Sequence, residues 1–152
     1  MSDAQAERAL LQRLAAGPVS GDTLEREAGQ TRAAVWKRIE ALRAAGVVVD
    51  AVPGRGYALR QAPEWLDAAA IRDAMPPAAR DALAALDIAW TLDSTNSELL
   101  RRAVPARGCA VLLAERQTGG RGRRGRSWES PLAAHVYLSV ARQFEGGLAR
   151  LG

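Results

Sequence analysis

The stretch that decides the fold of the N-terminal part runs from residue 20 to residue 45, S-G-D-T-L-E-R-E-A-G-Q-T-R-A-A-V-W-K-R-I-E-A-L-R-A-A. Ser20 and Thr31 can each cap a helix, and Gly29 ends the first of the two. Apolar residues at helical spacing form one stripe of the second helix: Val35, Ile39 and Leu42. Two helices joined by a short turn that contains glycine are typical of a helix-turn-helix motif.

The residues on either side complete this motif. Residues 5 to 16 have leucines at helical spacing and predict a preceding helix. Residues 47–52 and 57–59 are β-branched or aromatic runs on either side of Pro53-Gly54-Arg55-Gly56, which predicts a hairpin with Arg55 at its tip. Three helices and a hairpin make a winged helix-turn-helix, which we place at residues 1–61 and expect to bind DNA.

The second helix of the motif carries a cluster of basic residues on its open side. We expect this helix to enter the major groove of DNA. The candidates for DNA contact are Arg32, Ala33, Trp36, Lys37, Arg38, Arg43 and Arg55. Ala33, Trp36 and Lys37 are the candidates for base edges, whereas the arginines suit phosphates. The alternative is a winged helix that contacts only protein.

After Gln61-Ala62-Pro63 the pattern changes, and we place a second domain at residues 62–152. Helices are expected at 67–75 and 78–86, and strands at 88–92, 110–114 and 134–140, so this domain mixes helices and strands. In the last strand, Val136, Leu138 and Val140 alternate with His135, Tyr137 and Ser139. Because three strands and one or two helices would leave the sheet poorly covered, we interpret the sequence as a fragment of a longer protein.

The loop Gly120-Arg121-Gly122-Arg123-Arg124-Gly125-Arg126 lies between two of these apolar strands. Arginine offers a planar fork of donors that suits phosphate and carboxylate, and glycine lets the backbone bend around a ligand. The loop therefore fits a nucleotide-phosphate or acyl-adenylate site. Its composition fits equally well a solvated basic loop, or an arginine-glycine segment that touches RNA.

The turn Asp93-Ser94-Thr95-Asn96 is expected where a strand meets a helix. Thr95 and Glu98 match a capping box. Backbone N–H groups at a helix start favour a polar or anionic ligand group. Simple capping of the helix is the competing interpretation.

Composition sets outer limits on the kind of protein. The 152 residues are 48% apolar and 25% charged, with a net charge of +4, as in an ordinary globular protein. The sequence contains no apolar run long enough for a bilayer and no signal peptide, and its single cysteine, Cys109, cannot form an intrachain disulfide. We therefore expect a cytoplasmic protein without membrane contact.

Taken in order, these motifs resemble those of the biotin protein ligases. The segments that carry the resemblance are Asp93–Asn96, Glu115-Arg116-Gln117, Gly120–Trp128, Ser130-Pro131 and Val136-Tyr137-Leu138-Ser139. In the first domain, Thr31–Ala34 and Val52–Tyr57 narrow the resemblance to the bifunctional type, which is both ligase and repressor of the biotin operon. It covers most of residues 7 to 145. It implies an α+β fold, in which a winged helix-turn-helix precedes an incomplete mixed α/β catalytic domain of the class II synthetase type.

The resemblance also implies roles for individual residues. Those expected to contact biotin or its adenylate are Ser94, Thr95, Asn96, Gln117, Arg121, Gly122, Arg123, Arg124 and Trp128. Arg121 and Arg123 are the expected catalytic residues. Arg126 is a further candidate for phosphate, packing is an equal alternative for Trp128, and His135 is interpreted as a strand residue and not a catalyst.

In such a ligase the biotin carboxylate attacks the α-phosphorus of ATP, with Mg²⁺ assisting, and gives biotinyl-5′-adenylate and pyrophosphate. A lysine of the biotin carboxyl carrier protein of acetyl-CoA carboxylase then takes the biotin. The other implied partners are operator DNA and a second copy of the chain, as a homodimer, when the adenylate is bound.

One departure from the family pattern matters. The Lys-Trp-Pro-Asn-Asp segment that supplies a catalytic lysine in the family is not found, and Lys37 is the only lysine of the sequence. We therefore expect the 152 residues alone to bind biotin poorly and to ligate little. Two alternatives stay open: a DNA-binding regulator whose second domain senses a ligand without catalysis, and a basic RNA-binding loop on an unrelated fold.

Overall fold

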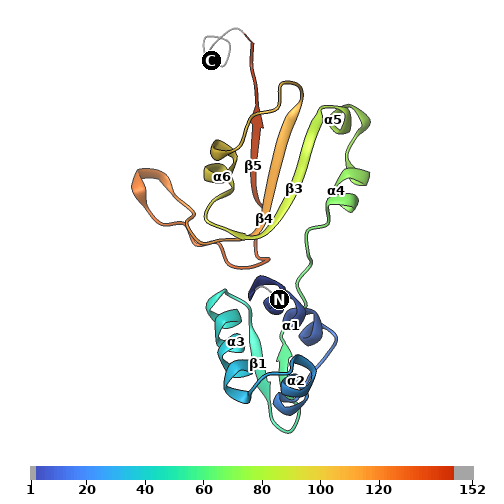
Figure 1. The fold of residues 1–152 in the computed structure, drawn as a ribbon, viewed down its shortest axis with the longest axis vertical. Helices are drawn as coiled ribbons and strands as arrows, with labels where there is room; N and C mark the ends of the chain where they lie inside the picture. Colours follow the sequence, from blue (N-terminus) through green and yellow to red (C-terminus); the bar gives the residue numbers. More distant parts are fainter. Residues whose placement is uncertain (1–2, 146–152) are drawn as a thin grey trace. The chain divides into compact units, whose positions relative to one another are not determined.

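The structure, a computed structural model, describes residues 3–145 (Figure 1). They fall into two compact units. Among the described residues, one unit extends to Glu64 and includes Pro131–Ala134, and the other contains Trp65–Ser130 and residues 135–145. The first unit has a two-stranded sheet and the second a three-stranded sheet, each accompanied by helices. The α+β class expected from the sequence is confirmed.

Three helices form the body of the first unit: α1 (Asp3–Ala15), α2 (Gly21–Ala28) and α3 (Arg32–Ala44). The Ser20 hydroxyl accepts the N–H of Thr23 at 3.1 Å, and the Thr31 hydroxyl accepts that of Ala34 at 3.3 Å, so both predicted caps are confirmed. The most deeply buried side chains of this unit are Leu11, Leu14, Ile39 and Leu42.

The wing is an antiparallel hairpin of β1 (Val49–Val52) and β2 (Gly56–Leu59), as predicted. Val19, before α2, joins its edge: its N–H donates to the Tyr57 carbonyl at 2.9 Å, and the Tyr57 N–H donates back at 2.8 Å. Gly56 has φ 91°, and a Cβ there would collide with the Val19 carbonyl and with Ser20. Only glycine permits this approach of the wing to the helices.

The second unit begins with α4 (Ala68–Ala74), which Asp67 caps as expected, and with the short α5 (Pro77–Asp81). The helix expected over residues 78–86 is wrong beyond Asp81, because residues from Leu83 belong to strand β3 (Leu83–Leu92). Leu83 pairs with Cys109 and Leu86 with Val111 in a neighbouring parallel strand. Pairing between segments about 25 residues apart therefore overrides the local helical preference of this alanine-rich stretch.

The sheet of this unit has the order β3-β4-β5, with β4 (Cys109–Gln117) in the centre. β3 and β4 are parallel and are joined through α6 (Thr95–Arg101), whereas β5 (Tyr137–Arg142) runs antiparallel to β4. α6 packs against β4 and β5, and α4 and α5 lie along β3 (Figure 1). Because β3 and β4 are parallel, the Asp93–Asn96 turn and the glycine-arginine loop follow strand ends at the same edge of the sheet, where open α/β sheets usually bind ligands.

The alternation predicted for the last strand is confirmed, but its predicted bounds, residues 134–140, are wrong, because the strand begins at Tyr137 and ends at Arg142. Tyr137 is 5% exposed, whereas Val136, Leu138 and Val140 are exposed. His135 was expected within the strand, and this is wrong, because it precedes β5; its side chain is exposed and lies edge-on to the Tyr137 ring. Tyr137 and Ser139 share the face that α6 covers, which brings them beside the α6 start.

None of the helices in the described part of the chain has the length and apolar character needed to cross a bilayer.

Candidate functional site

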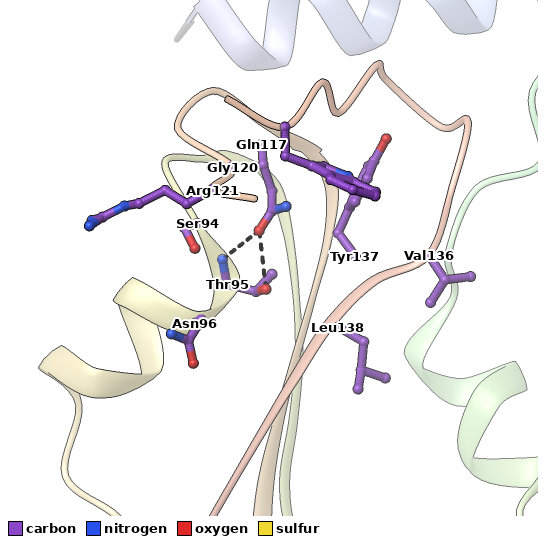
Figure 2. Close-up of a pocket in the computed structure, with 10 residues that line it drawn as sticks. Ser94, Thr95, Asn96, Gln117, Gly120, Arg121, Val136, Tyr137 and Leu138 are labelled. Atoms are coloured by element: carbon purple, nitrogen blue, oxygen red, sulfur yellow. Dashed lines mark hydrogen bonds between the residues drawn. The ribbon is translucent and has the colours of Figure 1, made fainter. Parts of the chain in front are cut away.

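The site starts at the turn that joins β3 to α6. Ser94 is the helix cap, with its hydroxyl near the Ser97 N–H at 3.4 Å, so the capping box expected at Thr95 and Glu98 is wrong. Thr95 is instead the first residue of α6, is 4% exposed and turns inward. Figure 2 shows Ser94, Thr95 and Asn96 at this end of the helix, with Gln117 reaching toward Thr95.

Thr95 belongs to a polar network that spans three elements. Its backbone N–H donates to Gln117 Oε1 at 2.8 Å, and its hydroxyl donates to the same oxygen at 3.1 Å (Figure 2). The Thr95 hydroxyl also hydrogen-bonds the Ser139 hydroxyl at 2.8 Å. The Gln117 amide nitrogen donates to Ser130 Oγ at 3.3 Å. The start of α6, the end of β4 and the first half of β5 are therefore held together by hydrogen bonds among hydroxyl and amide groups.

Tyr137 lies at the end of this network. Burial raises the pKa of its phenol above 10.0, and a hydrogen bond with Ser130 acts in the opposite direction. Tyr137 is therefore a neutral hydroxyl at physiological pH.

The glycine-arginine loop follows β4 and folds back on itself. The Gly122 N–H donates to the Arg126 carbonyl at 2.7 Å, and the Trp128 N–H donates to the Gly120 carbonyl at 2.9 Å. A short 3₁₀ turn, η1 (Arg123–Gly125), forms the tip, where Arg124 has φ 61°. The loop is thus closed by its backbone.

The side chains of the loop contrast with its backbone. Arg121, Arg123, Arg124, Arg126 and Trp128 are all exposed. Arg121 makes only a long contact, 3.5 Å, with the Ser97 hydroxyl. The arginine side chains of the loop are therefore available to pair with an anion, either in solvent or in the cavity beside the loop.

This cavity has a volume of about 280 Å³, close to the lower limit of small-molecule pockets. Its lining includes six of the residues that the sequence analysis selected: Ser94, Thr95, Asn96, Gln117, Arg121 and Trp128. The structure does not place Gly122, Arg123 or Arg124 in the lining. It adds Gly120 from the loop, and Val136, Tyr137 and Leu138 from the β5 side.

These four residues were not among those predicted from the sequence, and Tyr137 and Gly120 show two different reasons. Tyr137 could have been predicted, since the alternation of the last strand already placed it with Ser139 on one face. Gly120 lines the cavity through a close approach: a Cβ there would lie 2.9 Å from the Trp128 carbonyl oxygen and 3.1 Å from Ser130 Oγ. That approach depends on how the loop closes, which no local pattern reports.

A group of ion pairs braces the other side of the α6 start. The Asp93 carboxylate receives both terminal nitrogens of Arg101, at 2.7 and 3.0 Å, and Glu98 bridges Arg101 and Arg102. The hydrogen bonds from Arg101, followed by the Ser94 backbone, lower the pKa of Asp93 from 3.8 to about 2. The Asp93 carbonyl also accepts the Gly119 N–H at 2.7 Å, so this residue connects the turn to the start of the loop.

In the described residues, no cluster of three or more histidine, cysteine or carboxylate side chains could hold a metal ion. The described residues therefore do not form a site that would hold the expected Mg²⁺ by protein ligands alone. An ion of this kind commonly binds through one or two carboxylates and the phosphates of a nucleotide.

In the first unit, α3 presents an open face. Arg32, Ala33, Trp36 and Lys37 are exposed, with Trp36 57% exposed. Arg55 is exposed in the turn of the wing, and Arg38 is half-buried. The Arg43 guanidinium is engaged within the fold, because it donates to the Val49 carbonyl at 2.7 and 3.0 Å and pairs with Glu40. Arg43 is therefore a brace between α3 and the wing, and a weaker candidate for phosphate than the sequence indicated.

Two family models match separate parts of the chain. Residues 7–58 match the HTH domain, and residues 88–148 match the biotin/lipoate A/B protein ligase family. The second range contains the turn, the loop and the whole cavity lining.

Curated proteins are similar along nearly the whole chain. The bifunctional ligase/repressor BirA of Salmonella typhimurium is 40% identical over 150 residues, which cover 98% of this chain and 45% of that protein. The protein of the same name from Escherichia coli is 40% identical over 130 residues, covering 86% and 39%. A biotin–[acetyl-CoA-carboxylase] ligase of Mycobacterium tuberculosis is 46% identical over 57 residues, covering 36% and 21%.

The chain thus spans less than half the length of these relatives. Within that span, the segment that matches the HTH domain comes first, and the segment that matches the ligase family follows it. Residues 88–148 therefore belong to the biotin/lipoate A/B protein ligase family, and an HTH domain precedes them in the same chain.

Proposed function

We propose that this chain forms the biotin-binding part of an ATP-dependent biotin protein ligase that also binds operator DNA. The observation that carries the proposal is the cavity at the α6 start, where Ser94, Thr95, Asn96, Gln117 and Arg121 meet inside the segment matched to the ligase family. The relatives named as ligase/repressors support the pairing of the two activities.

The proposed reaction has two steps. A biotin carboxylate oxygen bonds to the α-phosphorus of ATP, and pyrophosphate leaves with the electrons of the broken P–O bond. A lysine amine of the biotin carboxyl carrier protein then attacks the acyl carbon, loses a proton and forms an amide as AMP leaves.

The residues of this chain divide the binding task by charge. The neutral wall of Thr95, Gln117 and Tyr137 suits the uncharged ring end of biotin, since hydroxyl and amide groups there are already oriented. Arg121, with the exposed Arg123 and Arg124 next along the same loop, suits the carboxylate and the α-phosphate. Cations there would oppose the repulsion between two anions and stabilise the charge that develops as they join.

Isothermal titration calorimetry with biotin tests the binding part of this proposal. We expect weak, saturable binding of one biotin per chain, because the neutral wall is preformed. Lipoate, which lacks a cyclic urea, is the matched control and should bind at least tenfold more weakly. Equal affinity for the two acids, or no heat with either, would contradict the assignment.

A second candidate function keeps the pocket but not the catalysis. The residues that line the described cavity include no lysine, since Lys37, the single lysine of the 152 residues, lies on α3. A DNA-binding regulator with a ligand-sensing second domain is compatible with such a lining. Biotin-dependent exchange of pyrophosphate into ATP, measured on a protein of the relatives' full length, separates the two, because a sensor binds biotin and gives no exchange, whereas a ligase gives both.

For the first unit we propose that α3 reads the major groove and that Arg32, Arg38 and Arg55 contact phosphates. The exposed Ala33, Trp36 and Lys37 supply the reading face. A single winged helix covers a short half-site, so recognition of a palindromic operator requires a homodimer, which we expect when the adenylate is bound.

Changing Lys37 to alanine tests this interface. We expect weaker binding to operator DNA and a salt dependence whose slope falls by about 1 if the lysine contacts a phosphate, measured by fluorescence anisotropy at several salt concentrations. Arg43→Ala is the comparison variant. It removes the hydrogen bonds from Arg43 to the Val49 carbonyl and should lower the unfolding temperature. Unchanged affinity in Lys37→Ala would count against α3 as the reader.

A further inference from the structure

Ser130 is a buried hydroxyl that touches two residues of the cavity wall without lining the cavity itself. It is 6% exposed and follows the glycine-arginine loop. Its Oγ accepts the Gln117 amide N–H at 3.3 Å, and it hydrogen-bonds Tyr137. Both partners line the cavity, so Ser130 supports two ligand-facing groups at once.

The donors and acceptors of this network allow only one orientation of the Gln117 amide. The backbone N–H of Thr95 can only donate, and it lies 2.8 Å from Gln117 Oε1, so the oxygen must face Thr95. The amide nitrogen is then at the other end, where Ser130 accepts one of its two N–H groups. Having accepted, Ser130 has its own proton to give to Tyr137.

Thr95 and Ser130 fix different ends of this amide. The bonds to Thr95 hold the oxygen end of the amide. The bond to Ser130 fixes the nitrogen, and with it the direction of the second N–H. The same hydroxyl also directs the Tyr137 proton away from Ser130.

We infer that Ser130 is a positioning residue, which holds the Gln117 amide and the Tyr137 hydroxyl as donors at the cavity wall and so makes this wall select a ligand with a carbonyl oxygen. The inference deepens the proposed function and rests on it, because the cyclic urea of biotin carries an acceptor of this class. Serine or threonine alone can play the part, since the position needs one acceptor and one donor on a small side chain.

The first test needs no ligand. In the 152-residue chain, the two side-chain amide protons of Gln117 should give separate NMR signals that exchange slowly with water. Ser130→Ala should speed this exchange at least tenfold, and Ser130→Thr should restore it. Ser127→Ala, at an exposed serine of the same loop, is the matched control and should leave the signals as they are.

Tyr137 provides an independent spectroscopic signature. Because the hydrogen bond from Ser130 lowers its pKa, Ser130→Ala should move its titration to higher pH, followed by tyrosinate absorbance. A merely structural serine would lower the unfolding temperature without moving this titration.

The second test uses biotin. Loss of one positioning hydrogen bond should weaken biotin binding by about tenfold in Ser130→Ala, with less than a twofold change in Ser130→Thr and Ser127→Ala. If the unaltered chain fails to bind biotin, the proposed function fails, while the amide and tyrosine signals still decide the role of Ser130. Unchanged amide exchange and an unchanged Tyr137 titration in Ser130→Ala would overturn the inference. Should that variant not fold, Ser130→Cys, a much weaker acceptor of similar size, makes the same comparison.

Discussion

The two walls of the cavity are built in opposite ways. The wall at the α6 start is a network of hydroxyl and amide groups in which Thr95 is 4% and Ser130 6% exposed. The glycine-arginine wall has exposed side chains on a loop that only backbone hydrogen bonds close. A buried, hydrogen-bonded wall is ordered before the ligand binds, whereas exposed cations become ordered when they pair with an anion. We therefore expect the first wall to recognise the neutral end of the ligand and the second its charged end.

The largest effect that separates the walls is expected from Arg121→Ala. Affinity for a non-hydrolysable biotinyl-adenylate analogue should fall by about tenfold to a hundredfold, because a charge-assisted hydrogen bond is lost. Affinity for biotin methyl ester, which has no anionic end, should change less than twofold. Competition binding measures both affinities. An equal loss of affinity for the two ligands would contradict the assignment of the charged end to one wall and the neutral end to the other.

A smaller effect on binding, joined to a loss of stability, is expected from Thr95→Val. The change keeps the side-chain shape and removes the hydroxyl that joins Gln117 to Ser139. All biotin ligands should bind about five- to tenfold more weakly, and the free energy of unfolding should fall by about 1 kcal/mol. Urea unfolding and calorimetry measure the two quantities. Thr91→Val, at an exposed position of β3, is the control, and an effect of equal size there would contradict the special role of Thr95.

The smallest effect is expected from the ion pairs beside the network. The folded-state pKa of Asp93 lies below 3.8, so its pairing with Arg101 stabilises the fold above that pH and is lost as pH falls toward about 2. Arg101→Gln should raise the pKa of Asp93 and slightly lower the melting temperature near neutral pH. The difference from the unaltered chain should shrink as the solution is acidified. A difference that stays constant across that range would place its cause elsewhere.

Local patterns in the sequence predicted the first unit well. The apolar stripe of Val35, Ile39 and Leu42 is buried, and Ser20 and Thr31 are the caps. Helices close their hydrogen bonds within four residues, so periodicity and capping report them directly. The exposed face of α3 followed from the same stripe.

The second unit was predicted less completely because its decisive contacts are distant in the chain. β3 begins at Leu83 only because β4 pairs with it. Thr95 fits a capping box in sequence, yet its partners are 22 and 44 residues away, and Ser94 takes the cap. Ser130 and Tyr137 join the site through such pairings, and a single sequence does not report them.

We expect this cavity to hold the neutral end of biotin without help from the anionic end of the ligand. An NMR titration of the 152-residue chain with biotin tests it most directly, because chemical shifts detect even millimolar binding. We predict saturable shifts of the Thr95 amide and the Gln117 side-chain amide, retained with biotin methyl ester and in Arg121→Ala. Shifts confined to the loop arginines, lost with the ester, or an unchanged spectrum at millimolar biotin would contradict the account.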